Sequence, residues 1–481
     1  MSTYDLIVRR GTLVRAGGPE EVDLAVADGR IAAIASGLEG TAREEIDALG
    51  LHVFPGAIDA HAHFNEPGRT HWEGFETGSR ALAAGGMTAY AEMPLNAYPP
   101  TTDAESFDLK LAAAEASSLV DFALWGGIQS DNLYKLEELA DRGVLGFKAF
   151  MSTSGTLDFQ SVDDLTLYEG MERAAKLGLP VLVHAENKTI TDALANRAMS
   201  TVRTTMRAYL DSRPVVAELE AIGRAILFAE ETGCSLHIVH VSTGRGVALV
   251  AEARTRGVDV SCETCAHYLV LTDEDAEALG AVAKCAPPLR PRKDLEELWG
   301  QLFEGNVEFV TSDHSPAPPE MKVGDDFFRI WGGISGCQSL LNVMLDEGHH
   351  NRGLPLARVA ALVSGNVARR FGLVEKGRLE VGADADLALV DLDATSTLRP
   401  QDLLYRHKAS PFVGRTFHGS VVRTIVRGTT VFRKGKVVSE PVGRLVKTGR
   451  RAAATPGVWQ AGRPHTVRTR GVNIEQSGQP N

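Results

Sequence analysis

The chain has 481 residues, of which 44% are hydrophobic and 23% charged, values typical of a globular protein and a length too great for one small domain. Its formal net charge of -12 disfavours nucleic acid and anionic membranes as partners, because both attract basic surfaces. A large barrel with a smaller appended domain is the natural division of this length.

Five cysteines in a chain of this length do not make a disulfide framework, so we expect a reducing, cytoplasmic compartment. Cys262 and Cys265 have no second pair at zinc-knuckle spacing, and we interpret them as structural. The first residues, MSTYDLIVRRGTL, begin strand-like alternation and contain no continuous apolar segment, unlike a secretory signal. No apolar run approaches the length of a bilayer span, so we expect no membrane association.

The two ends of the chain predict one small β-rich domain, formed by residues 1–54 and 380–440. Short β-prone segments cover residues 4–9, 22–27, 30–34, 386–391, 421–426 and 430–432. Asp28-Gly29 and Arg427-Gly428 stand between consecutive segments, and the first of them is a common hairpin signal. Pairing of the two ends would form a β-sandwich.

Residues 55–379 alternate short apolar runs with longer stretches of helical periodicity. The expected strands cover residues 57–64, 88–93, 122–128, 146–150, 180–185, 236–241, 259–267 and 307–313. Helical patterns lie between them, for example at residues 73–84, 165–177, 216–232 and 295–303. Eight such repeats predict an α/β fold, a TIM-like (β/α)8 barrel.

Residues 441–481 are rich in Arg, Gly, Thr, Gln and Pro and show no periodicity. We expect them to form a polar C-terminal tail. Such a tail is mobile, or lies over the surface of the protein or of a neighbouring subunit.

The first expected barrel strand ends in Ala60-His61-Ala62-His63. Side chains two residues apart on a strand face the same side, so His61 and His63 project together. The C-terminal mouth is where barrel enzymes hold their active sites, and imidazole is a frequent ligand of zinc-like metals. Alone, the pair is equally well explained by two surface histidines near a turn.

Three other expected strands also end in residues that bind metals. His184 ends the fifth strand, His240 the sixth and Asp313 the eighth. His237 has the opposite parity and lies farther from the strand end, so His240 is the expected ligand. Asp313 is preferred over His314 because a carboxylate is a hard ligand and a proton acceptor. Four such coincidences at one mouth predict a metal site.

Lys148 lies in the apolar segment Gly146-Phe147-Lys148-Ala149-Phe150. Burial lowers the pKa of a lysine and leaves a nucleophilic neutral amine. Such an amine takes up carbon dioxide to become an anionic carbamate, whose two oxygens suit a bridge between two metals. The alternative is a lysine that extends to the mouth, and the surrounding histidines favour the carbamate.

Longer motifs resemble the cyclic amidohydrolases, and within them the allantoinases, over nearly the whole chain to about residue 440. The most specific stretch is PGAIDAHAHFNEPGRTHWEGFETG, which begins at Pro55, followed by EMPLN at Glu92. Further similar stretches are KCAPPLR, SDHSP, WGGISG and YRHK, which begin at Lys284, Ser312, Trp331 and Tyr405.

The resemblance implies a binuclear metal centre. Its two ions would be held by the residues singled out above, namely His61, His63 and Asp313 for one ion, and His184 and His240 for the other. Carboxylated Lys148 and a hydroxide would bridge them. The usual metal of the family is zinc (Zn2+), with Mn2+, Co2+, Ni2+ or Fe2+ in some members, and the members are commonly homotetramers.

The activity implied is metal-dependent hydrolysis of the hydantoin ring amide of allantoin to allantoate, a step of purine catabolism. Asp313 would take a proton from the attacking water and pass it to the ring nitrogen. Substrate contacts are expected from residues near the mouth, namely Asn96, Arg69, Thr153, Gly332 and Gly333, with Glu66 and Ser154 as further candidates. Arg69 is equally well explained as the ion-pair partner of a neighbouring acid.

Three other functions fit the same fold. A hydantoinase or dihydropyrimidinase would share every ligand, and only the Glu-Pro-Gly-Arg-x-His-Trp stretch favours an allantoinase. A dihydroorotase usually has an arginine where this chain has Asn65. A non-catalytic assembly protein typically lacks metal ligands, which are all present here. Ala286 stands where allantoinases often have serine, so a contact there would come from the backbone.

Overall fold

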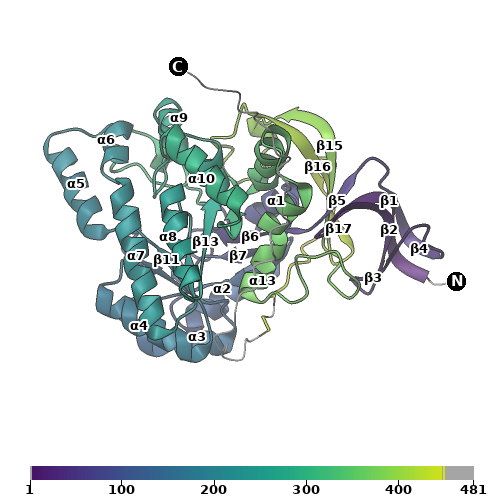
Figure 1. Ribbon diagram of the computed structural model, residues 1–481, viewed down its shortest axis with the longest axis horizontal. Coiled ribbons are helices and arrows are strands. Elements are labelled where there is room, and N and C mark those ends of the chain that lie inside the picture. The colour runs from purple at the N-terminus through teal and green to yellow at the C-terminus, as the bar shows by residue number, and fades with distance from the viewer. Residues whose placement is uncertain (1–2, 447, 450–481) are drawn as a thin grey trace, which may run out of the picture.

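The computed structural model describes residues 3–446, 448 and 449, and it has two parts, a β-rich domain and an α/β barrel. In Figure 1 the strands from both chain ends gather at one side, and the barrel with its helices lies at the other. The expected fold class, a TIM-like barrel with a small β-sandwich built from both ends, is confirmed. We retain residues 1–54 with 380–440, and 55–379, as the proposed domain limits.

The β-rich domain is one hydrogen-bonded sheet in the order β18-β17-β16-β15-β5-β1-β2-β3, with β4 beside β1. Its strands in the described residues are β1 (Thr3–Arg15), β2 (Gly18–Ala27), β3 (Arg30–Ala35), β4 (Thr41–Asp47), β5 (His52–Pro55), β15 (Leu387–Thr397), β16 (Thr416–Val426), β17 (Thr429–Arg433) and β18 (Lys436–Val437). The two chain ends meet where β15 pairs antiparallel with β5. Leu6, Leu24 and Val53 share one core with Leu387 and Ile425, so the sheet folds over on itself around apolar side chains from both ends.

Both expected hairpins are present. Ala27 pairs with Arg30 across the first turn, and Val426 pairs with Thr429 across the second. The two central residues of each turn have positive φ, with 52° and 73° at Asp28-Gly29 and 44° and 77° at Arg427-Gly428. Positive φ at both positions is the geometry that matches the right-handed twist of the flanking strands.

Eight parallel strand positions form the barrel within the described residues, and they agree with the expected segments to within a few residues. They are β6 (Ala57–Ala62), β7 (Met87–Glu92), β8 (Asp121–Leu124) with β9 (Gly126–Gly127), β10 (Phe147–Phe150), β11 (Val181–His184), β12 (Leu236–Ile238), β13 (Val260–Cys265) and β14 (Phe309–Thr311). β8 and β9 fill one position because only Trp125 separates them. The barrel closes where Ala62 forms a parallel bridge with His314 and the His63 amide donates to the His314 carbonyl at 2.8 Å.

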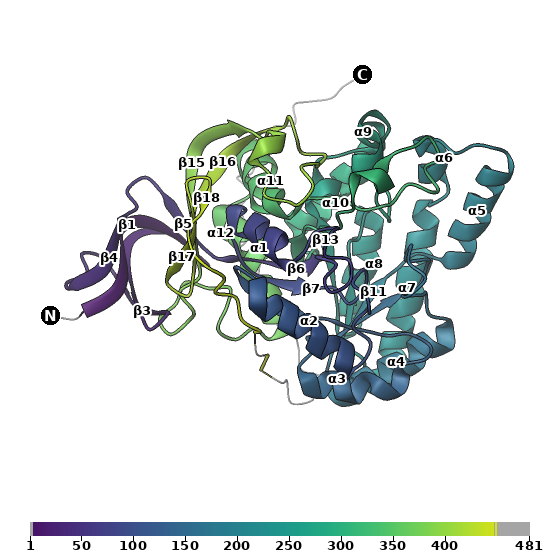
Figure 2. The same cartoon turned by 180° about the vertical axis from the view of Figure 1, so that it is seen from behind.

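Helices cover the outside of the barrel, and Figure 2 shows α1, α2 and α3 on the face that lies behind in Figure 1. The helices of this layer are α1 (Phe75–Ala84), α2 (Ala104–Ser117), α3 (Leu136–Arg142), α4 (Asp164–Leu177), α7 (Val215–Thr232), α8 (Gly244–Thr255), α10 (Arg292–Glu304) and α13 (Asn366–Phe371). The connecting segments add α5 (Lys188–Ser200), α6 (Met206–Asp211), α9 (Asp273–Leu279), α11 (Leu340–Val343) and α12 (Leu356–Ala360). Local signals fix the ends of α4: the Asp163 side chain accepts from the Thr166 amide, and Gly178 ends the helix at φ 68°. Within the described residues, none of the helices has both the length and the apolar composition to cross a bilayer.

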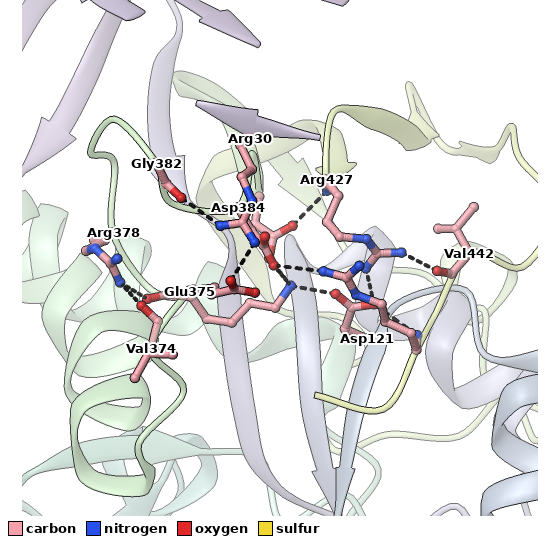
Figure 3. A network of polar contacts seen from close by, with 12 residues as sticks. Arg30, Asp121, Val374, Glu375, Arg378, Gly382, Asp384, Arg427 and Val442 are labelled. Carbon is pink, nitrogen blue, oxygen red and sulfur yellow. Dashed lines mark hydrogen bonds and ion pairs between the residues drawn. The ribbon is translucent and has the colours of Figure 1, made fainter. Parts of the chain in front are cut away.

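A buried ionic network joins the two domains at the start of β8 (Figure 3). The Lys376 ammonium lies 2.5 Å from Asp121, 2.9 Å from Asp384 and 2.7 Å from Asp386. Arg427, in the turn between β16 and β17, also pairs with Asp121. The three carboxylates are spaced like metal ligands, but the Lys376 ammonium contacts all three and occupies the place of a cation between them. The network therefore links the first residue of a barrel strand to two segments of the β-rich domain.

The first part of the expected tail packs against the barrel. The Phe122 amide donates to the Arg444 carbonyl at 3.0 Å, and the Val446 amide donates to the Phe122 carbonyl at 2.7 Å. Leu445 thus lies beside β8 as a short additional strand pair. This agrees with the expectation of a segment lying over the surface, while residue 447 and residues 450–481 lie outside the described residues.

Candidate metal centre and active site

A cavity of about 470 Å³ opens at the C-terminal ends of the barrel strands, within the size range of small-molecule sites. Five of the six expected metal ligands line it: His61 and His63 from β6, His184 from β11, His240 after β12 and Asp313 after β14. Residues separated by more than 200 positions in the sequence therefore meet at one mouth, as the strand-end reasoning predicts.

His61, His63 and Asp313 form one tight group. The Nε2 atoms of His61 and His63 lie 3.2 Å and 3.4 Å from Oδ1 of Asp313. Burial opposes the ionisation of Asp313, but the surrounding histidines outweigh it and hold the pKa of the carboxyl well below its usual range. Burial also lowers the pKa of His63 to about 4, so this imidazole is neutral at physiological pH. An anionic oxygen beside two imidazole nitrogens is a donor set that suits a divalent cation.

His184 and His240 form a second group beside the first. Their rings meet edge to face with centroids 4.5 Å apart, and the His240 ring lies 5.5 Å from that of His61. Phe150 stacks on His184 at 4.6 Å and fixes the plane of its ring. Burial lowers the pKa of both histidines, which keeps a nitrogen lone pair available on each ring.

Lys148 lies beneath the cavity on β10 and is fully buried. Its charge acts on His184 and His240 of one group and on His63 and Asp313 of the other. Burial lowers the pKa of Lys148 to about 7, so much of the amine is neutral at physiological pH. Among the described residues its Nζ has no hydrogen-bond partner. A buried amine without a partner, between two groups of metal-competent side chains, fits a modified lysine that bridges two ions.

Two of the expected ligands stand in strained backbone just beyond their strands. β12 ends at Ile238 and β14 ends at Thr311, so His240 and Asp313 each follow by two residues. Both have positive φ, 40° and 43°, a conformation that costs a side-chain-bearing residue about 1–3 kcal/mol. The strand-parity argument by which His240 was chosen over His237 therefore does not extend to these positions. The structure nevertheless directs His240 into the cavity and keeps His237 out of its lining.

Two buried glutamates behind the histidines were not predicted from the sequence. Glu263 Oε1 lies 2.5 Å from Nδ1 of His61, and Glu186 Oε2 lies 2.8 Å from Nε2 of His184. Burial alone would raise the pKa of each carboxyl, but neighbouring groups lower both to about 2: His61 and His237 act on Glu263, and Arg213 and His184 act on Glu186. A glutamate inside a buried barrel strand is a sequence signal that could have identified Glu263. The sequence analysis considered only the flanking Cys262 and Cys265 in this segment.

Arg69 is placed away from the cavity lining. Its guanidinium donates to both carboxylate oxygens of Asp158 at 3.0 Å and to the backbone carbonyl of Asn96 at 3.0 Å. It also lies over the rings of Trp72 and Tyr98. With these contacts, the ion-pair interpretation describes Arg69 better than the substrate-binding one, and the residue fixes the loop that presents Asn96.

Asn96, Thr153, Ser154, Gly332 and Gly333 do line the cavity. The Asn96 amide nitrogen lies 3.5 Å from Nδ1 of His63, and its Oδ1 is buried with no hydrogen-bond partner among the described residues. A buried carbonyl oxygen that faces a cavity without a partner is available to a substrate N–H. Glu66 instead accepts from the Phe75 amide at the start of α1, at 2.9 Å.

Lys284 is a further cavity residue that the sequence analysis did not single out as a side chain. Its Nζ donates to the Ile330 carbonyl and lies 4.4 Å from the centre of the Tyr209 ring. Its carbonyl accepts from the Gly333 amide at 2.7 Å. Lys284 thereby holds the glycine loop at the rim of the cavity, and the Gly333 amide is not free for a substrate.

The unpartnered amine of Lys148 leads to a stability prediction. Lys148→Met should stabilise the metal-free protein by about 1–3 kcal/mol, because it removes a buried donor that lacks an acceptor. The folded pKa of about 7 lies below the ordinary 10.5, so the wild type loses stability as the pH falls between these values. The gain should therefore be larger at pH 7 than at pH 10 in urea unfolding with a chelator present.

Lys110 provides the matched control. It is equally buried, but its Nζ donates to the Met93 carbonyl at 2.7 Å and lies 3.8 Å from Glu92. Lys110→Met removes a satisfied donor and leaves Glu92 without its cation, so it should destabilise the protein. Equal losses of stability in both variants would contradict the prediction for Lys148.

Comparisons with known proteins show the family and several relatives of this chain. The family model described as the amidohydrolase family matches residues 52–431. A curated protein named allantoinase from Rubrobacter xylanophilus is 70% identical over 94% of this chain and 99% of its own length. Another allantoinase, from Solibacter usitatus, is 56% identical over 94% of this chain and 99% of its own.

Solved structures of hydantoinases and dihydropyrimidinases share the fold. The L-hydantoinase (dihydropyrimidinase) from Arthrobacter aurescens has a TM-score of 0.90 and 38% identity, and covers 92% of this chain and 100% of its own. A dihydropyrimidinase from Brevibacillus agri has a TM-score of 0.87 and 32% identity, with 92% and 98% coverage. This chain therefore shares its whole architecture with these two solved structures, while its sequence is more similar to the two allantoinases.

Proposed function

The chain belongs to the amidohydrolase family, whose members depend on metals, and we propose that it hydrolyses the ring amide of allantoin to give allantoate. The observation that supports this most is the meeting of His61, His63, His184, His240 and Asp313 at one cavity above the unpartnered Lys148. The 70% identity to an allantoinase, against 38% to the hydantoinase structure, favours allantoin over other cyclic amides.

Two divalent ions, with zinc first and manganese, cobalt, nickel or iron as alternatives, would be held by the ligand residues named above. Lys148, carboxylated by carbon dioxide, would lie between them. When bound, such ions supply Lewis-acid chemistry and a water of lowered pKa, about 7 instead of 15.7. A serine or cysteine nucleophile is then unnecessary.

Asp313 is the proton carrier of this proposal. Its carboxylate is ionised and lies at the cavity wall, with Oδ1 toward His61 and His63. It accepts a proton from the attacking water and delivers it to the ring nitrogen as the amide bond breaks. For one group to serve both steps, this carboxylate has to lie within hydrogen-bond reach of both the attacking water and the ring nitrogen.

The substrate would be oriented by the polar groups that remain open in the cavity. Asn96 offers a carbonyl oxygen with no hydrogen-bond partner among the described residues, and Thr153, whose hydroxyl donates to Asp192 at 3.4 Å, lines the cavity on the segment after β10. Gly332 allows close approach of the ring, because a Cβ there would meet only one atom within 4 Å, at 4.0 Å. We further propose a cytoplasmic homotetramer, in line with the resemblance to the cyclic amidohydrolases.

A substrate panel tests the assignment. The purified protein, loaded with zinc, manganese or cobalt, is assayed on racemic allantoin, hydantoin, dihydrouracil and dihydroorotate. We expect kcat/KM for allantoin to exceed the others by about 10²-fold or more, since substrates that lack the ureido group leave polar cavity atoms unpaired. A preference for hydantoin or dihydrouracil would leave the proposed mechanism in place but show that the assigned substrate is wrong.

A further inference from the structure

Glu263 is the only charged residue of β13 (Val260–Cys265), and its side chain is fully buried inside the barrel. Its two oxygens face two histidines: Oε1 lies 2.5 Å from Nδ1 of His61, and Oε2 lies 3.2 Å from Nε2 of His237. Nδ1 of His237 lies in turn 2.7 Å from the Ser261 hydroxyl. A line of polar groups thus extends through the barrel interior and ends at one cavity histidine.

The chemistry of these groups fixes the direction of each hydrogen bond. A carboxylate only accepts, so His61 must donate its Nδ1–H and His237 its Nε2–H. The other nitrogen of His61, Nε2, lies on the side of Asp313, 3.2 Å away, and it is the nitrogen that would offer its lone pair to a metal ion. The Ser261 hydroxyl donates to Nδ1 of His237, which completes the line. Glu263 therefore sets both the tautomer and the orientation of His61.

The charge of Glu263 is not cancelled by a fixed cation. Among the described residues, no arginine or lysine lies within ion-pair distance of its carboxylate. Glu186, behind His184, differs because Arg213 pairs with it directly. Lys148 acts on Glu263 only through space, and carboxylation of Lys148 would remove even that positive charge. The Glu263 carboxylate therefore places a negative charge beside His61 inside the barrel, and bound divalent cations would compensate this charge.

We propose that Glu263 is a positioning residue for the metal centre, which holds His61 with Nε2 toward the ion and supplies a buried negative charge that favours its binding. This inference rests on the proposed metal-dependent function, but not on the identity of the substrate. His237, which faces away from the cavity, serves as the second donor that keeps the Glu263 carboxylate in place.

Glu263→Gln tests the proposal because it keeps the shape and one acceptor oxygen but removes the charge. We expect metal affinity, measured by chelator competition with zinc or cobalt, to fall about 10–100-fold, and the visible spectrum of the cobalt-loaded protein to change. At saturating metal, kcat should recover to within a few-fold of wild type, since Glu263 does not line the cavity.

Glu218→Gln is the matched control. Glu218 is equally buried and accepts hydrogen bonds from the amide and hydroxyl of Ser242, at 2.7 Å each, without contacting a ligand histidine. Its metal affinity and cobalt spectrum should match wild type. If Glu263→Gln does not fold, Glu263→Asp is the second variant. It keeps the negative charge, but its shorter side chain moves the carboxylate away from His61, so we expect a several-fold weaker affinity for the metal.

Wild-type affinity and an unaltered cobalt spectrum in the Glu263 variants would overturn the proposal. These readouts are independent of the substrate panel. A protein that opens a ring other than allantoin would still show the expected loss of metal affinity. A wild-type protein that binds no divalent ion at all would overturn the proposed function and this inference together. The metal titration of the wild-type protein is therefore carried out first, because it detects this case.

Discussion

Asp313→Asn should lower kcat/KM for allantoin by about 10²–10⁴-fold, the range for removal of a general acid–base group. An amide does not take a proton from water at neutral pH, so the step that forms the attacking nucleophile and the step that protonates the leaving nitrogen are both impaired. The change also removes the anionic oxygen 3.2 Å and 3.4 Å from His61 and His63. We therefore expect the loss to lie toward the upper end.

Metal content separates the two causes of this loss. The variant is assayed after loading with zinc or cobalt, and the bound metal is counted per chain by elemental analysis. If both ions remain and activity is still lost, proton transfer accounts for the effect. If one ion is missing, the role of Asp313 as a ligand contributes as well.

Asp192→Asn provides a control inside the same cavity. Asp192 lines the cavity on α5, but its carboxylate pairs with Lys188 and contacts Thr153 rather than the histidines. Its amide variant should lose less than about tenfold in kcat/KM. A metal-loaded Asp313→Asn enzyme that retains comparable activity would contradict the assignment of Asp313 as proton carrier.

The barrel was predictable because its strands are buried on both faces and read as short apolar runs between helical patterns. Every expected strand has a counterpart, and the main differences are at the ends: β12 stops at Ile238 and β14 at Thr311, two residues before His240 and Asp313. The break between β8 and β9 at Trp125 was also not foreseen. The Trp125 amide still donates to the Glu92 carbonyl on β7, so the order of the strands is unaffected.

The convergence of the expected ligands at one cavity was predictable because strand ends meet at one mouth, whereas the groups that contact these side chains from behind were not predictable. Glu186 contacts His184 from two residues beyond the end of β11, and Glu263 contacts histidines of two other strands. The sequence of one protein does not show which acid faces which imidazole. Arg69 illustrates the same limit. Its partner Asp158 lies 89 positions away, so only the folded chain distinguishes an ion pair from a substrate contact.

Lys376→Ala should destabilise the protein by about 3–5 kcal/mol, the cost of leaving a buried charge without its partner. Lys376 is 2% exposed and contacts three carboxylates, each no more than 3% exposed. Burial opposes its charge, but the three acids raise its pKa above the ordinary range, so it is a cation in the folded state. Without it, Asp384 and Asp386 repel Asp121 across the junction of the two domains, and Arg427 compensates only part of that charge (Figure 3).

Urea unfolding measures this change, or the rate of heat inactivation if unfolding is irreversible. Lys293→Ala is the control, because Lys293 is 84% exposed and its contact with Glu297 at 3.7 Å is worth about 0.3–0.5 kcal/mol. Adding Asp386→Asn to Lys376→Ala should restore about 0.5–3 kcal/mol by removing one unpaired acid. A Lys376 variant as stable as the Lys293 variant would mean that water solvates these carboxylates and that the network does not hold the domains together.

Activity per folded chain should change little in Lys376→Ala, and this follows from the direction of the strands. Asp121 is the first residue of β8, whereas the cavity lies at the opposite, C-terminal ends of the barrel strands. Stability and catalysis are thus assigned to opposite ends of the same barrel. A loss of kcat that exceeds the loss of folded protein would show that the domain junction also sets the geometry of the metal ligands.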